Sequence, residues 1–169
     1  DWTRNTDNLI AAIREARAQK VSILCLPELA ISGYGCEDTF FSGYILERSL
    51  EGLRRIADAC EDIVVSVGLA MEMENCLYNV SALIQNRQIL GFAAKQELAG
   101  DGVYYEPRWF KSWPDNLVRS YTLDGVTYPF GDLIFEVDGV RIAFEICEDA
   151  WNGVRPAQDH YLNNVDIIL

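Results

Sequence analysis

Residues 21–28 of the chain read VSILCLPE, an apolar run that stops at a proline followed by a glutamate. A short continuous apolar run is typical of a strand that is buried on both faces. Before it, apolar residues recur at helical spacing from Leu9 to Ala16, and the polar residues 5–7 predict the N-terminus of that helix. A helix followed by a buried strand is the basic unit of a layered α/β fold.

The same unit recurs in the next part of the chain. Residues 46–60 have the apolar spacing of an amphipathic helix, and residues 63–69 form a second apolar run of strand length. This alternation of helices and buried strands predicts an α/β protein in which helices pack on a sheet.

The second half of the chain has a different pattern. Two hairpins are predicted, over residues 80–94 and over residues 133–144, the second across the turn dipeptide Asp138-Gly139. Between them, residues 99–128 show no clear periodicity and are rich in Gly, Asp, Tyr and Trp. We therefore expect a long loop there, acting as a lid or binding a ligand.

Neither end of the sequence carries a terminating signal. Pro156 predicts a short helix through about Asn163, and residues 165–169 begin a strand that is still apolar at the last residue. No strand is predicted before the first helix. We expect residues 1–169 to form a single domain that is incomplete at both ends.

Composition and charge narrow the classes of function. The net charge of −12 argues against a nucleic acid or an anionic membrane surface as partner, because phosphate groups would be repelled. No apolar stretch is long enough to predict a membrane span. The cysteines number five, two of them in apolar periodic segments, and no signal-peptide pattern is seen, which favours a reducing, cytoplasmic setting.

The single histidine, His160, limits the chemistry further. Histidine-clustered zinc sites cannot be built, acidic pairs lack the spacing of calcium loops, and no glycine-rich phosphate loop occurs. We expect no metal ion or cofactor in this domain, and we expect His160 on the surface of the helix that follows Pro156.

Three reactive side chains each come directly after a separate apolar run: Glu28, Lys95 and Cys147. Strand ends of a layered α/β fold meet at one sheet edge, so the three could act together as base, oxyanion-binding cation and nucleophile. Each one alone has a structural explanation: a capping glutamate, a lysine whose stem covers a sheet edge, or an inert cysteine. The combination favours an active site with a cysteine nucleophile.

The motifs around these residues resemble those of the nitrilase (carbon–nitrogen hydrolase) superfamily. The three motifs lie, in the same order, at residues 26–34, 78–95 and 145–149. The resemblance implies a four-layer α-β-β-α sandwich, of which this chain supplies a truncated part.

A narrower set of motifs, at residues 33–38, 105–110 and 129–132, is similar to the N-terminal glutaminase domain of glutamine-dependent NAD synthetases. This resemblance implies that glutamine is hydrolysed to glutamate and ammonia, and that the ammonia amidates deamido-NAD in a separate ATP-dependent domain. ATP and Mg²⁺ would belong to that second domain, which is absent from this chain. A homo-oligomer is also common in the family.

The resemblance assigns a role to each member of the predicted triad. Cys147 would attack the side-chain carboxamide of glutamine, and Glu28 would take the proton of the thiol. Lys95 and the backbone N–H of Glu148 would hold the oxyanion. Because a carboxylate does the work of the base, the mechanism is consistent with a chain that has one histidine.

Further substrate-binding residues are implied by the same motifs. Glu106 matches a second glutamate that supports the lysine and the substrate, and Tyr104 lies beside it on the segment that resembles a glutamine-binding lid. Tyr34 and Trp151 lie next to two of the motifs and could line the pocket. For the aromatic residues, ordinary packing is the alternative, and it is favoured for Trp151.

Two other functions stay open from the sequence. One is a free-standing carbon–nitrogen hydrolase that acts on another small amide. The other is a non-enzymatic interaction module that retains the scaffold, against which the intact set of glutamate, lysine and cysteine argues.

Overall fold

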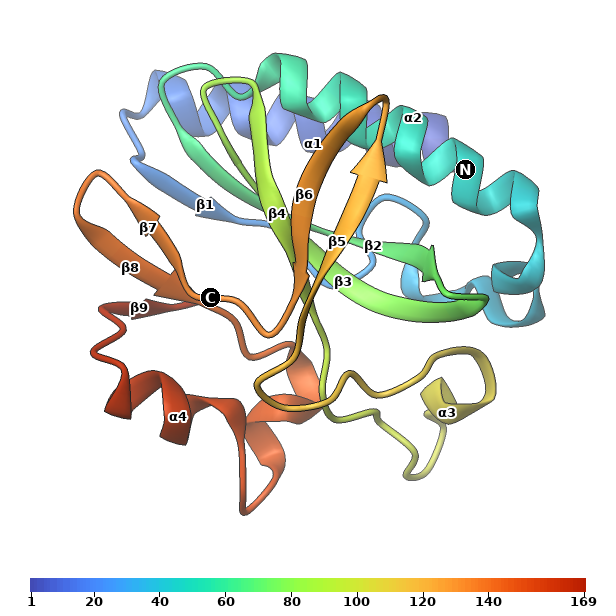
Figure 1. Cartoon of the computed structure of the whole chain (residues 1–169). Coiled ribbons are helices and arrows are strands. Elements are labelled where there is room, and N and C mark those ends of the chain that lie inside the picture. The colour runs from blue at the N-terminus through green and yellow to red at the C-terminus, as the bar shows by residue number, and fades with distance from the viewer.

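The computed structural model describes residues 1–169, which form two β-sheets with helices outside them (Figure 1). The six-stranded sheet has the order β1-β2-β3-β4-β6-β5, and its strands are β1 (Ile23–Cys25), β2 (Val64–Met73), β3 (Cys76–Gln85), β4 (Gln88–Ala94), β5 (Val118–Leu123) and β6 (Val126–Gly131). The three-stranded sheet consists of β7 (Phe135–Val137), β8 (Val140–Ala143) and β9 (Ile167–Ile168), in that order. The helices are α1 (Trp2–Ala18), α2 (Gly43–Ala59), α3 (Glu106–Trp109) and α4 (Pro156–Leu162), with 3-10 helices η1 (Tyr34–Phe41) and η2 (Cys147–Trp151).

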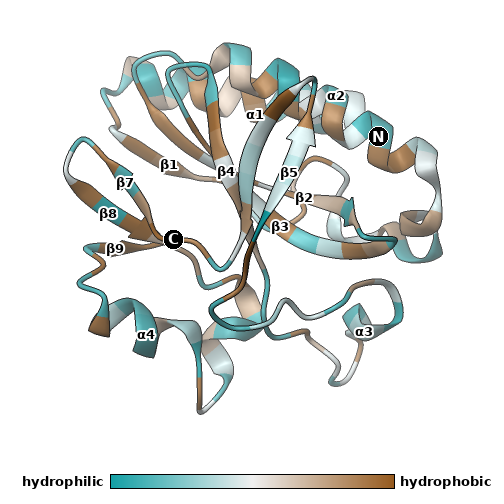
Figure 2. Cartoon of the chain, in the orientation of Figure 1, coloured by the Kyte–Doolittle hydropathy of each residue, from teal (hydrophilic) through white to brown (hydrophobic).

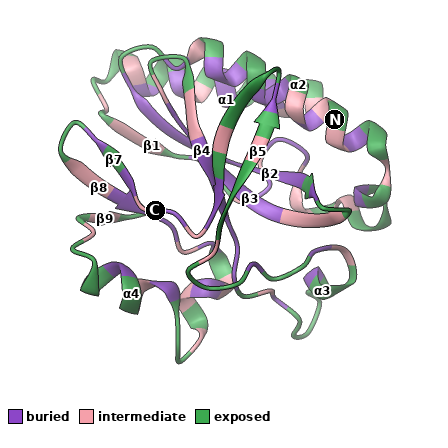
Figure 3. Cartoon of the chain, in the orientation of Figure 1, coloured by how far each residue is buried: buried purple, intermediate pink, exposed green.

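The six-stranded sheet is buried on both faces along its central strands β2, β3 and β4. On one face it packs against α1 and α2, and the alternating strand residues Val65 and Val67 belong to that core. Hydrophobic and hydrophilic residues alternate around both helices (Figure 2), and so do buried and exposed residues (Figure 3). The buried apolar residues of both helices belong to one core with those of the sheet. Because side chains of a strand alternate between faces, Val64 points the other way and packs against the small sheet.

The contact between the sheets forms a second core. Its nine buried residues are Val64, Leu83, Ala93, Leu133, Phe135, Val137, Ile142, Phe144 and Ile146. Helix α4 lies beyond the small sheet, on the side away from α1 and α2 (Figure 1). The layers therefore follow the order helices, sheet, sheet, helix, and the predicted nitrilase-like α-β-β-α arrangement is confirmed. None of the helices is both long and apolar enough to cross a lipid bilayer.

The predicted order of helices and strands along the first 94 residues is confirmed, and the boundaries differ. Helix α1 starts earlier than expected from residues 5–7, because the carboxylate of Asp1 accepts a hydrogen bond from the N–H of Arg4 and caps the helix. Strand β2 runs on to Met73, where Glu74 and Asn75 both have positive φ (51° and 60°) and turn the chain into β3.

The prediction of a loop over residues 99–128 is wrong for its second half. Strands β5 and β6 form a hairpin across Asp124 and Gly125, whose φ values are 53° and 78°. An Asp-Gly pair is a strong hairpin signal. The strand pattern was hidden because β5 lies at the edge of the sheet and most of its side chains are exposed, so few of them need to be apolar.

The predicted surface position of His160 is also wrong. Its side chain is buried, and Nε2 lies 3.1 Å from the carbonyl oxygen of Phe144. Helix α4 thus uses its histidine to satisfy a carbonyl of the segment that leads from β8 to Cys147.

Candidate active site

Lys95 follows β4 and lies between two carboxylates. Its Nζ is 2.7 Å from Oε1 of Glu28 and 2.8 Å from Oε2 of Glu106, and none of the lysine side chain is exposed. A buried ammonium group is stable only when it is paired and hydrogen-bonded, so the two glutamates hold it in its charged form. Residues 28, 95 and 106, which the sequence placed in one site, are in direct contact.

Asn79, on β3, completes this cluster. Its Nδ2 donates hydrogen bonds to Glu28 (2.7 Å) and to Glu106 (3.0 Å). The N–H of Ala99 donates a further bond to Glu106, at 2.7 Å. Asn79 lies in the second of the three motifs that resemble the family, at residues 78–95, although sequence reasoning assigned it no role of its own in the site.

The electrostatics of the cluster favour proton transfer at Glu28. Burial raises the pKa of Glu28 above its ordinary value, although the charge of Lys95 counteracts this. Burial lowers the pKa of Lys95, but the charges and hydrogen bonds of Glu28 and Glu106 more than offset it, so that this pKa is raised. A carboxylate with a raised pKa next to a permanent cation is suited to act as a general base.

Cys147 begins η2 in a strained conformation, with a φ of 53°. Non-glycine residues adopt such angles rarely, and they do so often at functional sites. The thiol is accessible, and it lines a pocket of about 170 Å³ together with Glu28. Burial and the negative charge of Glu28 raise the pKa of Cys147, so the thiol needs a base to become a nucleophile.

The turn at Cys147 also provides a hydrogen-bond donor. Glu148 is the second residue of η2, where a backbone N–H has no partner inside the helix. Such an N–H group next to a nucleophile can stabilise an oxyanion.

Gly68 on β2 determines where Glu28 can lie. A Cβ atom at this glycine would be 2.7 Å from the carbonyl oxygen of Pro27 and 2.8 Å from the carbonyl carbon of Glu28. Both are shorter than real Cβ contacts, so the segment after β1 can pack on β2 only because residue 68 has no side chain. No sequence pattern singled out this glycine.

The predicted aromatic residues differ in position. Tyr34 has a buried hydroxyl group without a hydrogen-bond partner, and burial together with the charges of Glu106 and Glu28 raises its pKa. Tyr104 is half exposed and packs edge-to-face on Tyr34, with 6.1 Å between ring centroids. Trp151 is 79% exposed, so the packing alternative for it is wrong. It does not line the pocket of Cys147 in this structure, and its role in substrate binding stays a prediction.

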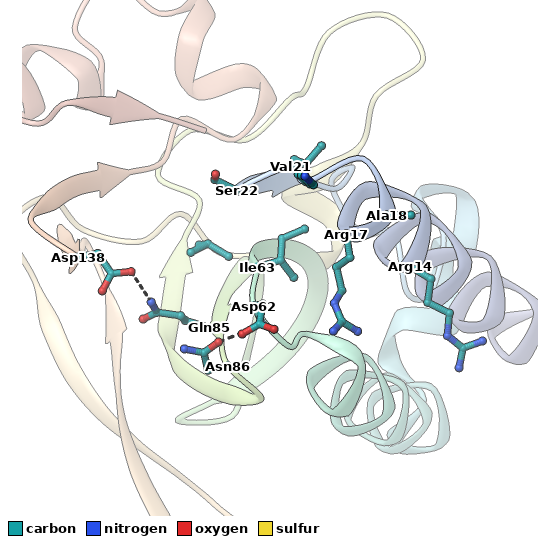
Figure 4. A pocket seen from close by; sticks show the side chains of 12 residues that line it. Arg14, Arg17, Ala18, Val21, Ser22, Asp62, Ile63, Gln85, Asn86 and Asp138 are labelled. Carbon is teal, nitrogen blue, oxygen red and sulfur yellow. Dashed lines mark hydrogen bonds between the residues drawn. The ribbon is translucent and has the colours of Figure 1, made fainter.

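A larger hollow, of about 780 Å³, lies away from these residues (Figure 4). It is lined by Arg14 and Arg17 from α1 and by polar residues of the β3–β4 turn, and it contains neither Cys147 nor Lys95. Its charges are mixed, and Asp138 is already hydrogen-bonded to Gln85 at 2.9 Å. The volume of a hollow therefore does not identify the active site. The reactive side chains Glu28 and Cys147 identify the smaller pocket as the candidate. No group of three or more His, Cys, Asp or Glu side chains is arranged to hold a metal ion.

Comparison with known proteins decides the family. The family model described as carbon-nitrogen hydrolase matches residues 1–169, which is the whole chain. The chain belongs to the carbon–nitrogen hydrolase family. This membership accounts for the order of the three motifs and for the four layers of the fold.

Among carbon–nitrogen hydrolases, the chain is similar to the N-terminal parts of much longer proteins. A crystal structure of a glutamine-dependent NAD(+) synthetase from Cytophaga hutchinsonii superposes with a TM-score of 0.91 and 44% identity, covering 99% of this chain and 27% of that one. The glutamine-dependent NAD(+) synthetases of Rattus norvegicus and Drosophila melanogaster are 32% and 33% identical, over 99% and 100% of this chain and 25% and 23% of their own lengths. The chain thus spans about a quarter of the length of these relatives.

Proposed function

We propose that this chain is the glutaminase part of a glutamine-dependent NAD synthetase, which hydrolyses glutamine to glutamate and ammonia. The proposal is supported by the carbon–nitrogen hydrolase family and by the names of the similar proteins from three organisms. The observation that carries it is the contact of Lys95 with Glu28 beside the pocket that Glu28 shares with Cys147.

In the first half of the reaction, Glu28 removes the proton of the Cys147 thiol and the sulfur attacks the carboxamide carbon of glutamine. The oxyanion that forms is stabilised by the ammonium group of Lys95 and by the N–H of Glu148. Glu28 then returns the proton to the nitrogen, the C–N bond breaks, and ammonia leaves behind a thioester on Cys147.

In the second half, Glu28 takes a proton from a water molecule, whose oxygen attacks the thioester carbon. The C–S bond breaks, glutamate leaves, and the proton returns to the thiolate of Cys147. Throughout both halves, Glu106 and Asn79 keep Lys95 and Glu28 in place, because Lys95 donates a hydrogen bond to Glu106 and Asn79 donates to both glutamates.

Binding of glutamine would use the aromatic residues near the pocket. The hydroxyl of Tyr34 is buried near the carboxylates of Glu106 and Glu28, and the ring of Tyr104 packs on that of Tyr34 from the segment that precedes α3. The ammonia would pass to a separate ATP-dependent domain, with ATP and Mg²⁺, and amidate deamido-NAD there.

The test uses the full-length protein and its Cys147→Ala variant. We expect wild-type protein to release ammonia from glutamine, and the variant to lose this activity by more than about 1,000-fold while it still forms NAD from deamido-NAD when free ammonia is supplied. Cys76→Ser, at the first residue of β3, is the matched control and should retain glutamine hydrolysis.

A second set of measurements separates the alternatives. Faster ammonia release from another small amide than from glutamine would favour a free-standing amidase. Unchanged glutamine hydrolysis by the Cys147→Ala variant would exclude the mechanism, and the absence of hydrolysis of any amide by wild-type protein would favour an interaction module.

A further inference from the structure

Asp149 connects two segments that are far apart in the sequence. Its Oδ2 accepts a hydrogen bond from the N–H of Ile146, the residue before Cys147, at 2.8 Å. Its Oδ1 accepts bonds from the N–H groups of Gln96 and Glu97, at 3.1 and 2.7 Å. These two residues directly follow Lys95, so one carboxylate contacts the neighbours of both the amine and the thiol.

Burial of this carboxylate costs free energy, and hydrogen bonds and a nearby charge offset that cost. Asp149 is 2% exposed, and burial raises its pKa to about 6, while the three backbone hydrogen bonds and the charge of Lys95 counteract the rise. An ordinary helix cap of η2 would need only the bond to Ile146. The two N–H groups on the other oxygen come from the segment that follows β4 of the six-stranded sheet, and they are not explained by capping.

The apolar core between the sheets packs Ala93 with Phe144 and Ile146, and the carboxylate of Asp149 adds hydrogen bonds between the two segments that follow them. Lys95 belongs to the six-stranded sheet and Cys147 follows β8 of the small sheet, so their separation depends on how the sheets are joined at this edge. The strained φ of 53° at Cys147 also requires its neighbours to be held from outside the turn.

We propose that Asp149 is a positioning residue whose carboxylate ties the turn of Cys147 to the segment after Lys95 and so sets the distance between thiol and amine. It touches neither substrate nor reacting atoms. The effect of Asp149 on turnover rests on the proposed glutaminase function, whereas its hydrogen bonds to the two segments do not depend on that function.

The experiment compares Asp149→Asn with wild-type protein in the full-length chain. The carboxamide keeps the size of the side chain but replaces one accepting oxygen with a donor. We expect kcat for glutamine to fall about 100-fold, the scale for a misplaced catalytic group, with KM changed less than about threefold. Asp166→Asn is the matched control, because Asp166 accepts one backbone N–H bond from Arg141 and is exposed, and its kcat should stay at the wild-type value.

Amide hydrogen exchange tests, without any substrate, whether Asp149 holds the two segments together. In the Asp149→Asn variant, exchange at residues 96, 97 and 146 should accelerate together, by about tenfold or more, while exchange in the centre of β2 stays unchanged. Unchanged exchange at residues 96 and 97, or an unchanged kcat, would overturn the proposal. If wild-type protein does not hydrolyse glutamine, the proposed function fails. The exchange data still show whether Asp149 holds the two segments together.

If the Asp149→Asn variant does not fold, hydrogen exchange of the wild-type protein alone tests the proposal. The amides of residues 96, 97 and 146 should then share one free energy of opening, after their rates are corrected for the intrinsic exchange rate of each residue, since they open in one event. Three different free energies of opening would overturn the proposal.

Discussion

The Nζ atom of Lys95 lies 2.8 Å from Oε2 of Glu106, and the two side chains are 0% and 1% exposed. A buried ion pair of this kind contributes little net stability, but the loss of one partner leaves the other charge buried without compensation. Glu106 is therefore needed to keep Lys95 charged and in place, which is the support of the lysine that the resemblance implied for it.

Replacing Glu106 by Gln should lower both stability and activity. We expect a loss of about 3 kcal/mol in the free energy of unfolding, the scale for breaking a buried pair. We also expect kcat for glutamine to fall about 100-fold, because Lys95 is no longer held at its place in the cluster. Urea unfolding and ammonia release measure the two effects. Glu97→Gln, which removes an exposed charge nearby, is the control, and equal effects of the two substitutions would contradict the assignment.

Replacing Gly68 by Ala should displace Glu28. The new methyl group collides with the backbone of residues 27–29, so the segment after β1 must move away from β2. We expect at least about a tenfold loss of kcat, because a shift of the base by a fraction of an ångström is costly. Gly43→Ala meets no atom within 4 Å and should leave kcat unchanged. A fully active Gly68→Ala protein would show that Glu28 does not depend on this contact.

Replacing Asn79 by Asp would place a third carboxylate against Glu28 and Glu106. Burial and like charges should raise the pKa of the new carboxyl above its unfolded value, so that the folded state binds its proton more tightly. Stability relative to wild type should therefore fall as the pH rises from about 4 to 8. Asn79→Leu lacks the charge, and its loss of about 1–3 kcal/mol should not depend on pH in this way. Denaturant unfolding at several pH values measures both, and equal pH profiles would contradict the prediction.

Alkylation of Cys147 by iodoacetamide should follow a thiol whose pKa lies above the ordinary value of 9.0, because burial and the charge of Glu28 disfavour the thiolate. Mass spectrometry of the labelled peptide at a series of pH values gives the midpoint. In a Glu28→Gln variant the negative charge is gone, so the thiolate is less disfavoured and the midpoint should fall. A wild-type midpoint below 8, or a rise in the variant, would argue against contact between the two side chains.

The sequence was sufficient for the features that depend on local pattern. Apolar spacing predicted α1 and α2, and the Asp138-Gly139 dipeptide predicted the hairpin of β7 and β8. The β5–β6 hairpin was missed in spite of its own Asp-Gly turn, because an exposed edge strand has no apolar pattern to detect. The burial of His160 was missed because a polar residue on a short helix normally faces water.

For the site, the sequence alone determined which chemical groups are present and that each follows a strand: a carboxylate at 28, an amine at 95 and a thiol at 147. Only the tertiary structure decided how those groups are held. Asn79, Gly68 and the buried carboxylate at 149 act through contacts with residues between 27 and 53 positions away. Hydrogen bonds and steric contacts depend on distances in space, and a linear pattern carries no information on such distances until the two sheets have packed together.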